Sequence, residues 1–129
     1  MNVDMQKIGI IDDDPSIVDV FTQMLTIFGY VPSPYTDPSV ALKSLPNEKP
    51  LPNLILLDLM MEPITGLQFL DEKLKNPVLK GIPVIIVSAW DLSEEDRLKY
   101  ATAISDVIRK PVHPKDLVNK IQTVIDKSP

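Results

Sequence analysis

Five polar side chains close four short apolar runs of the sequence. Asp12 and Asp13 end the run IGIIDD, and Asp58 ends NLILLD; Ser88 ends PVIIVS, and Lys110 follows DVIR. In an open parallel sheet the carboxyl ends of the strands lie along one edge, where ligands bind. We therefore expect three carboxylates, one hydroxyl and one ammonium group to converge on a single small site.

The three carboxylates Asp12, Asp13 and Asp58 are candidate ligands of a divalent cation. Carboxylates a few ångströms apart repel one another and raise one another's pKa unless a cation lies between them. Mg²⁺ fits this ligand set because it prefers one or two carboxylates together with waters and a phosphate oxygen, and Mn²⁺ can substitute. Zn²⁺ is disfavoured because neither histidine nor cysteine lies near these acids. The backbone carbonyl of Met60 is a further candidate ligand.

Asp58 is the candidate nucleophile because it stands alone at the end of its strand. A carboxylate beside Mg²⁺ can attack phosphorus and form an aspartyl phosphate. Such a transfer depends mainly on positioning and on charge neutralisation. Lys110 would supply a positive charge and Ser88 a hydroxyl donor to the phosphoryl oxygens. Trp90 lies two positions after Ser88, and we hypothesise that Trp90 and Met60 screen the phosphoryl group from water.

The elements that must position these residues follow an alternating strand and helix pattern. Short apolar runs alternate with longer stretches of helical period, which is typical of an α/β fold with a parallel sheet covered on both faces. The predicted strands cover residues 7–12, 30–35, 53–58, 84–88 and 106–109, and the predicted helices cover 15–28, 37–45, 66–75, 93–101 and a last stretch that begins at 114.

Local signals refine this assignment. Asp14 followed by Pro15 is typical of an N-cap and a first helical residue, and Gly29 is a candidate for the residue just after that helix. Pro32 and Pro34 cannot donate ladder hydrogen bonds, so their strand is predicted to lie at a sheet edge.

Composition narrows the class of protein. The chain has 129 residues, 44% of them hydrophobic, which fits one domain, 1–129, with an ordered core over about residues 5–127. The absence of cysteine permits a cytoplasmic location and excludes disulfides. The net charge of −5 disfavours direct binding to nucleic acid. No apolar stretch approaches the roughly 20 residues that span a bilayer, and the first residues do not resemble a signal peptide.

Taken together, the segments IGIIDDDPSI, NLILLDLMMEPITGLQFL, PVIIVSAW and DVIRKPVHPKDL resemble the receiver domain of two-component response regulators. The resemblance covers nearly the whole chain. It implies a flavodoxin-like sheet of order 2-1-3-4-5, an order for which the chemotaxis member of the family is a standard example. That order agrees with the edge position predicted from the two prolines.

The resemblance also implies a function. A sensor histidine kinase or a histidine phosphotransfer protein would donate a phosphoryl group to Asp58, with no turnover of an outside substrate. By position Asp12, Asp13 and the Met60 carbonyl match the family's metal ligands, and Ser88 and Lys110 match its hydroxyl and lysine. Phosphorylation would then shift a two-state equilibrium and change the face formed by the fourth helix, fifth strand and fifth helix, which binds a downstream target or a second copy of the chain.

Two positions depart from the family pattern. Val107 stands where an aromatic residue usually follows the hydroxyl inward, so any signal must move through backbone and loop shifts or through another side chain. Glu62 stands where a proline usually follows the two methionines, and Pro63 comes one place late.

Other functions remain open at the level of sequence. Asp12 and Asp14 have the spacing of a haloacid-dehalogenase-type phosphatase, although Pro15 fits the continuation of that motif poorly. A flavodoxin-like cofactor binder is disfavoured by the acidic turn after the first strand, which repels phosphate. A receiver-like domain that has lost phosphorylation is disfavoured because all five functional positions are filled. A phosphorelay shuttle without an output of its own remains an alternative.

Overall fold

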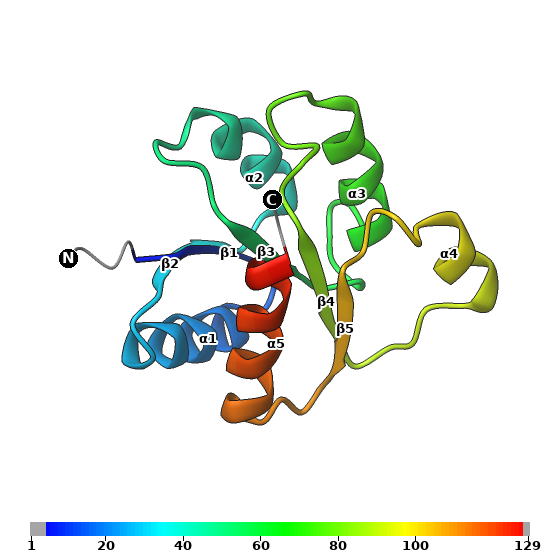
Figure 1. Cartoon of the computed structure of the whole chain (residues 1–129). Coiled ribbons are helices and arrows are strands. Elements are labelled where there is room, and N and C mark those ends of the chain that lie inside the picture. Colours follow the sequence, from blue (N-terminus) through cyan, green and yellow to red (C-terminus); the bar gives the residue numbers. More distant parts are fainter. Residues whose placement is uncertain (1–4, 128–129) are drawn as a thin grey trace.

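Five short parallel strands form the central sheet of the computed structural model, which describes residues 5–127. The strand order is β2-β1-β3-β4-β5 (Figure 1), as the resemblance implied. The strands comprise β1 (Lys7–Ile11), β2 (Val31–Tyr35), β3 (Leu54–Leu57), β4 (Val84–Ser88) and β5 (Asp106–Arg109). Every pairing is parallel, so the ends of β1, β3, β4 and β5 lie along one edge.

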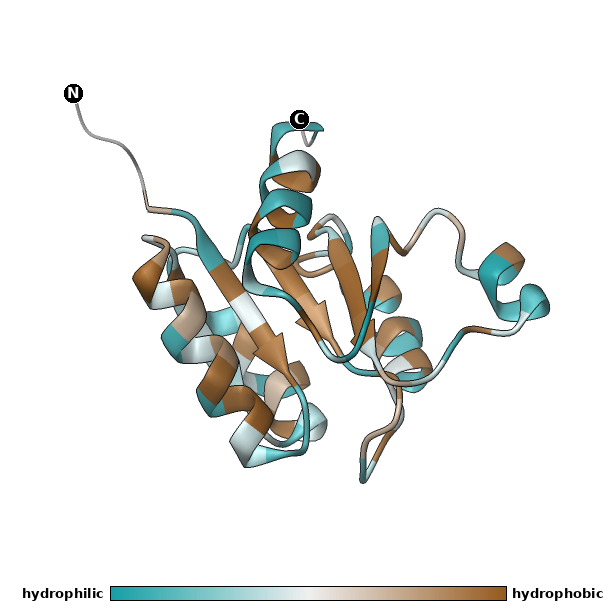
Figure 2. Ribbon diagram, turned by 90° about the horizontal axis from the view of Figure 1, so that it is seen from below, coloured by the Kyte–Doolittle hydropathy of each residue, from teal (hydrophilic) through white to brown (hydrophobic). Residues whose placement is uncertain are grey.

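Helices cover both faces of this sheet. One apolar cluster joins the sheet to α1 (Pro15–Ile27) and α5 (Pro114–Lys127). A second cluster lies on the opposite face, with α2 (Pro38–Ser44), a 3₁₀ turn (Leu45–Asn47), α3 (Gly66–Lys75) and the residues flanking α4 (Glu94–Lys99). The strands are mostly hydrophobic (Figure 2), and β3 and β4, central strands covered by helices on both faces, are fully buried. Within residues 5–127 no helix has the length and apolar character needed to cross a membrane.

The predicted helix signals are confirmed at α1. The Asp14 side chain accepts a hydrogen bond from the Ser16 N–H at 2.9 Å, and proline follows the cap. At the other end, Gly29 has a φ of 87° and the Tyr30 N–H donates to the Leu25 carbonyl at 2.9 Å. This pattern is a Schellman motif, which requires a residue that tolerates the left-handed region.

The edge prediction for β2 is also confirmed. β2 pairs only with β1, and the N–H of Val31 donates toward it, to the Gln6 carbonyl. In a strand alternate residues point their N–H groups to opposite sides. Pro32 and Pro34 therefore occupy outward positions, where the missing N–H costs no ladder hydrogen bond.

Most predicted elements differ from the observed ones by a residue at an end, but α4 is clearly shorter than predicted. We expected a helix over 93–101, whereas α4 ends at Lys99 and turns follow. Tyr100 is buried and its hydroxyl donates to Asp71 at 2.8 Å, which fixes the chain there. None of the residues of α4 itself is buried, so no tertiary packing supports a further turn.

Candidate functional site

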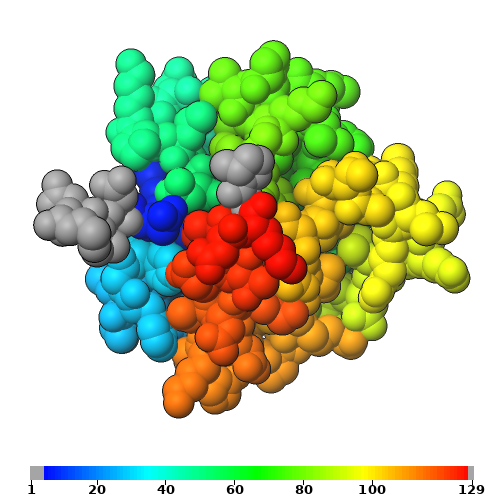
Figure 3. Space-filling view, viewed as in Figure 1, coloured from blue at the N-terminus to red at the C-terminus, as the bar shows by residue number. Residues whose placement is uncertain are grey.

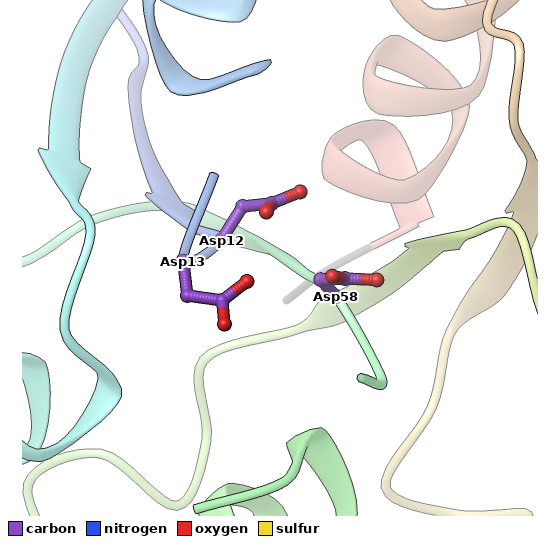
Figure 4. A group of neighbouring side chains, drawn as sticks. All are labelled: Asp12, Asp13 and Asp58. Carbon is purple, nitrogen blue, oxygen red and sulfur yellow. The ribbon is translucent and has the colours of Figure 1, made fainter. Parts of the chain in front are cut away.

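The three predicted carboxylates meet at the carboxyl edge of the sheet. Asp12 and Asp13 follow β1, and Asp58 follows β3, which pairs with β1; the Asp58 N–H donates to the Ile11 carbonyl at 3.0 Å. One oxygen from each carboxylate lies within 4.8 Å of the other two, and Figure 4 shows the side chains gathered there. Asp12 and Asp58 are buried, with 3% and 7% of their surface exposed, whereas Asp13 is exposed.

Backbone N–H groups hold each of these carboxylates. The Asp14 N–H donates to Asp12 Oδ1 at 3.0 Å, and the Leu59 N–H donates to Asp58 Oδ1 at 2.9 Å. The Glu62 N–H donates to Asp13 Oδ2 at 3.1 Å across the site. These donors were missed by the sequence reasoning, because a backbone N–H is present at almost every residue and gives no residue-type signal.

Lys110 brings a positive charge into the site from the end of β5. Its Nζ lies 2.7 Å from Asp12 Oδ2 and 3.8 Å from Asp58 Oδ1, and its side chain is 19% exposed. The backbone N–H of Lys110 also donates to the Ser88 carbonyl at 3.0 Å, which fixes the start of this loop against the end of β4. The ammonium therefore offsets one of the three negative charges.

Ser88 completes the predicted group at the end of β4. It is buried, and its Oγ accepts a hydrogen bond from the Trp90 N–H at 3.2 Å. All five predicted side chains are thus brought to one edge of the sheet. Met60 and Trp90 are exposed, with 56% and 61% of their surfaces accessible.

The electrostatics of the site oppose full ionisation of Asp58. Burial raises the pKa of the Asp58 carboxyl above its ordinary value, and the charge of Asp12 raises it further. The Lys110 ammonium, the Ser88 hydroxyl and the Leu59 N–H lower this pKa, but they do not cancel the effect of burial. The site therefore carries an excess of negative charge that a bound cation would relieve.

The donor set suits a hard metal ion. Three carboxylates converge, and a single ammonium compensates them only in part. Oxygen ligands with excess negative charge are what Mg²⁺ and similar ions prefer. The carboxylate cluster could therefore hold a metal ion.

Asp14 does not share this site. Its carboxylate caps α1 through Ser16, and the residue is exposed. The spacing of Asp12 and Asp14, which resembled a dehalogenase-type phosphatase, is thus accounted for by one site residue and one helix cap.

Comparison with known proteins identifies the family. The model of the response regulator receiver domain matches residues 8–122. The chain belongs to this family. Among solved structures, the CheY-like receiver domain protein from Methanospirillum hungatei JF-1 superposes with a TM-score of 0.86 at 28% identity, covering 97% of each chain.

Further similarity comes from a transcriptional regulator and a sensor kinase. The receiver domain is 32% identical over 121 residues to the phosphate regulon transcriptional regulatory protein PhoB of Escherichia coli K12, covering 93% of this chain and 52% of that protein. It therefore spans about half the length of this relative. The receiver domain of the sensor histidine kinase PA1611 from Pseudomonas aeruginosa PAO1, solved with magnesium in its active site cleft, has the same fold, with a TM-score of 0.82 at 24% identity over 96% of this chain and all of that one.

Proposed function

We propose that this receiver domain accepts a phosphoryl group on Asp58 from a histidine kinase or a histidine phosphotransfer protein. The observation that carries the proposal is the convergence of Asp58 with two further carboxylates and with the ammonium of Lys110. An Asp58 oxygen would attack phosphorus. The new P–O bond would form as the P–N bond to the donor imidazole breaks, and the imidazole would leave with the bonding electron pair.

Asp12, Asp13 and Asp58, with the backbone carbonyl of Met60, are the proposed ligands of Mg²⁺, for which Mn²⁺ can substitute. The ion would supply positive charge to the phosphoryl oxygens and orient the group for in-line transfer. The hydrogen bonds from the Asp14 and Glu62 N–H groups keep two of these carboxylates in place before any ion binds. The magnesium-bound receiver domain of PA1611 supports this assignment by analogy.

Lys110 and Ser88 are the proposed partners of the phosphoryl oxygens. Lys110 already lies 2.7 Å from Asp12, so its ammonium needs little movement to reach a group attached to Asp58. The Ser88 hydroxyl can rotate to donate to a phosphoryl oxygen, because a hydroxyl carries one donor hydrogen and two acceptor lone pairs. Each interaction would be stronger in the phosphorylated state, in which the oxygens bear more negative charge.

We further propose that residues 1–129 act as one receiver unit that modifies only itself. Its output would depend on a downstream target that recognises the face formed by α4, β5 and α5. The domain would work in the cytoplasm, where histidine kinases present their phosphoryl groups. Its acidic net charge of −5 argues against direct contact of this domain with nucleic acid.

Intact-mass spectrometry after incubation with acetyl phosphate and Mg²⁺ tests the proposal. We expect one addition of about 80 Da, the mass of one PO₃ group, which disappears when Mg²⁺ is chelated. Asp58→Asn should abolish the addition. Asp19→Asn is the matched control because it alters an exposed acid of α1 outside the site. An adduct that survives in Asp58→Asn, or no adduct at all, would refute the proposed function.

A further inference from the structure

A groove lies between α4 and β5, and its lining includes Arg109, which directly precedes Lys110 of the proposed site. Its volume is about 530 Å³. Its lining combines apolar side chains, among them Leu92, Tyr100, Ile104 and Val107, with the charged side chains of Asp91, Arg97, Asp106 and Arg109. Such a volume falls within the range of about 300–1,000 Å³ that is typical of sites for small organic groups. The groove is therefore ample for one aromatic ring.

The outer wall of this groove is loosely held. None of the residues of α4 is buried, although Leu92 before the helix and Tyr100 after it are both buried. Figure 1 shows α4 standing away from the sheet, and Figure 3 shows the same segment projecting from the side of the molecule. The helix is thus attached mainly through its two ends, and its separation from β5 can change at low cost.

Trp90 is next to this groove but lies outside it. It is the sole tryptophan of the chain, and 61% of its surface is exposed. The following two residues, Asp91 and Leu92, line the groove. A large aromatic side chain in water, next in sequence to a groove with apolar and charged walls, indicates a second position for the indole ring, whose body is apolar and whose N–H can donate to a charged acceptor.

One backbone contact of Trp90 involves the proposed phosphate-binding hydroxyl. The backbone N–H of Trp90, not its indole, donates to Ser88 Oγ at 3.2 Å. If Ser88 Oγ moves toward a phosphoryl group on Asp58, the Trp90 N–H loses this acceptor. The loop after β4 then loses one attachment, while the bonds of Arg109 to the Ala89 carbonyl at 3.2 Å and to Asp91 at 2.7 Å hold its neighbours against β5.

We propose that Trp90 enters the α4–β5 groove when Asp58 is phosphorylated; this inference rests on the proposed function. Other aromatic and apolar groups near the groove do not fill it. Val107 is too small, and Tyr100 is already buried and bound to Asp71. Trp90 would thus supply, from the loop after β4, the aromatic group that β5 lacks, and α4 would close over it.

Tryptophan fluorescence of the full chain tests this inference, because the signal comes from Trp90 alone. On addition of acetyl phosphate and Mg²⁺, with phosphorylation followed by intact mass, we expect a blue-shifted emission. The acrylamide quenching constant should fall about twofold or more, because a buried indole meets the quencher less often. Asp58→Asn should show neither change.

Val107→Phe is the decisive variant because it fills the groove and leaves the proposed phosphoryl site unchanged. It should gain the same mass as the wild type, but its Trp90 should stay as accessible to acrylamide as before phosphorylation. Ile104→Phe, which fills the groove from another wall, should behave in the same way and guards against a folding defect in either variant.

Three results would overturn the inference. If the wild type gains the mass adduct but Trp90 is not protected from acrylamide, the movement of Trp90 is rejected and the proposed function stands. The groove would then be open to a side chain of a partner protein. Protection that persists in both groove-filling variants would locate the indole over the phosphoryl group instead. No adduct at all would remove the proposed function and this inference with it.

Discussion

Lys73 lies on the buried side of α3, and its burial lowers the free energy of unfolding by an amount that depends on pH. Only 1% of its surface is exposed, and its Nζ donates to the Lys80 carbonyl at 3.2 Å. Burial lowers the pKa of Lys73 from 10.5 to about 8. Below about pH 8 the ammonium is charged in both the folded and the unfolded chain, and its desolvation reduces the free energy of unfolding. Between about pH 8 and 10.5 the folded state releases the proton first, so stability rises with pH.

Replacing Lys73 by methionine should therefore stabilise the domain at neutral pH. The pKa shift from 10.5 to about 8 corresponds to a gain of at most about 3 kcal/mol in the free energy of unfolding when the buried charge is removed. Loss of the hydrogen bond to the Lys80 carbonyl reduces this gain by about 1 kcal/mol. Urea unfolding from pH 7 to 10.5 should show an advantage of about 2 kcal/mol for Lys73→Met that shrinks as pH rises. Lys75→Met, at an exposed position of the same helix, is the control. A constant difference across this range would contradict the prediction.

At the scale of elements, the start of α3 is packed directly against the strand end that carries Asp58. The Gly66 N–H donates to the Leu59 carbonyl at 2.8 Å, while Thr65 and Gln68 form a capping box around it. A Cβ atom on Gly66 would lie 2.2 Å from the Asp58 carbonyl oxygen and 2.9 Å from Leu59 Cα. Both are backbone atoms, so one of the two elements would have to shift.

Gly66→Ala should consequently lower both the free energy of unfolding and the rate of phosphorylation at Asp58. Overpacking of this kind costs about 1–3 kcal/mol, and the displaced Asp58 should accept phosphoryl groups more slowly. Urea unfolding and the rate of the mass increase with acetyl phosphate measure the two effects. Gly81→Ala is a matched control, because its added Cβ meets nothing within 4 Å. Equal behaviour of the two variants would show that the close approach at Gly66 is unimportant.

These elements also mark what could be predicted from the sequence. Buried strands are short apolar runs, so their ends and the polar residues that follow them could be located. The convergence of these side chains could be predicted as well, but not which atoms pair, and the 2.7 Å contact of Lys110 with Asp12 is such a pairing. The burial of Lys73 had a partial signal, since it continues the apolar stripe of Phe69 and Leu70 at helical spacing. The end of α4 had none, because it depends on the absence of packing.

For the whole molecule, the two sheet edges determine whether copies of the domain can join strand to strand. The β5 edge is four residues long and carries charged Asp106 and Arg109 at its ends. The β2 edge is longer but has Pro32 and Pro34 at its outward positions, so it lacks donors for a further strand. Short, charged or proline-bearing edges are common protections against strand addition.

Restoring the missing donors should therefore promote self-association. In the double variant Pro32→Thr with Pro34→Thr, the strand regains two outward N–H groups, each worth about 1 kcal/mol in a new hydrogen bond. We expect the association constant, measured by sedimentation velocity over a range of concentrations, to rise more than about tenfold. Val31→Thr is the control, because it changes the same strand while its N–H still donates to Gln6. If the double variant sediments like this control at every concentration, the prolines do not protect the edge.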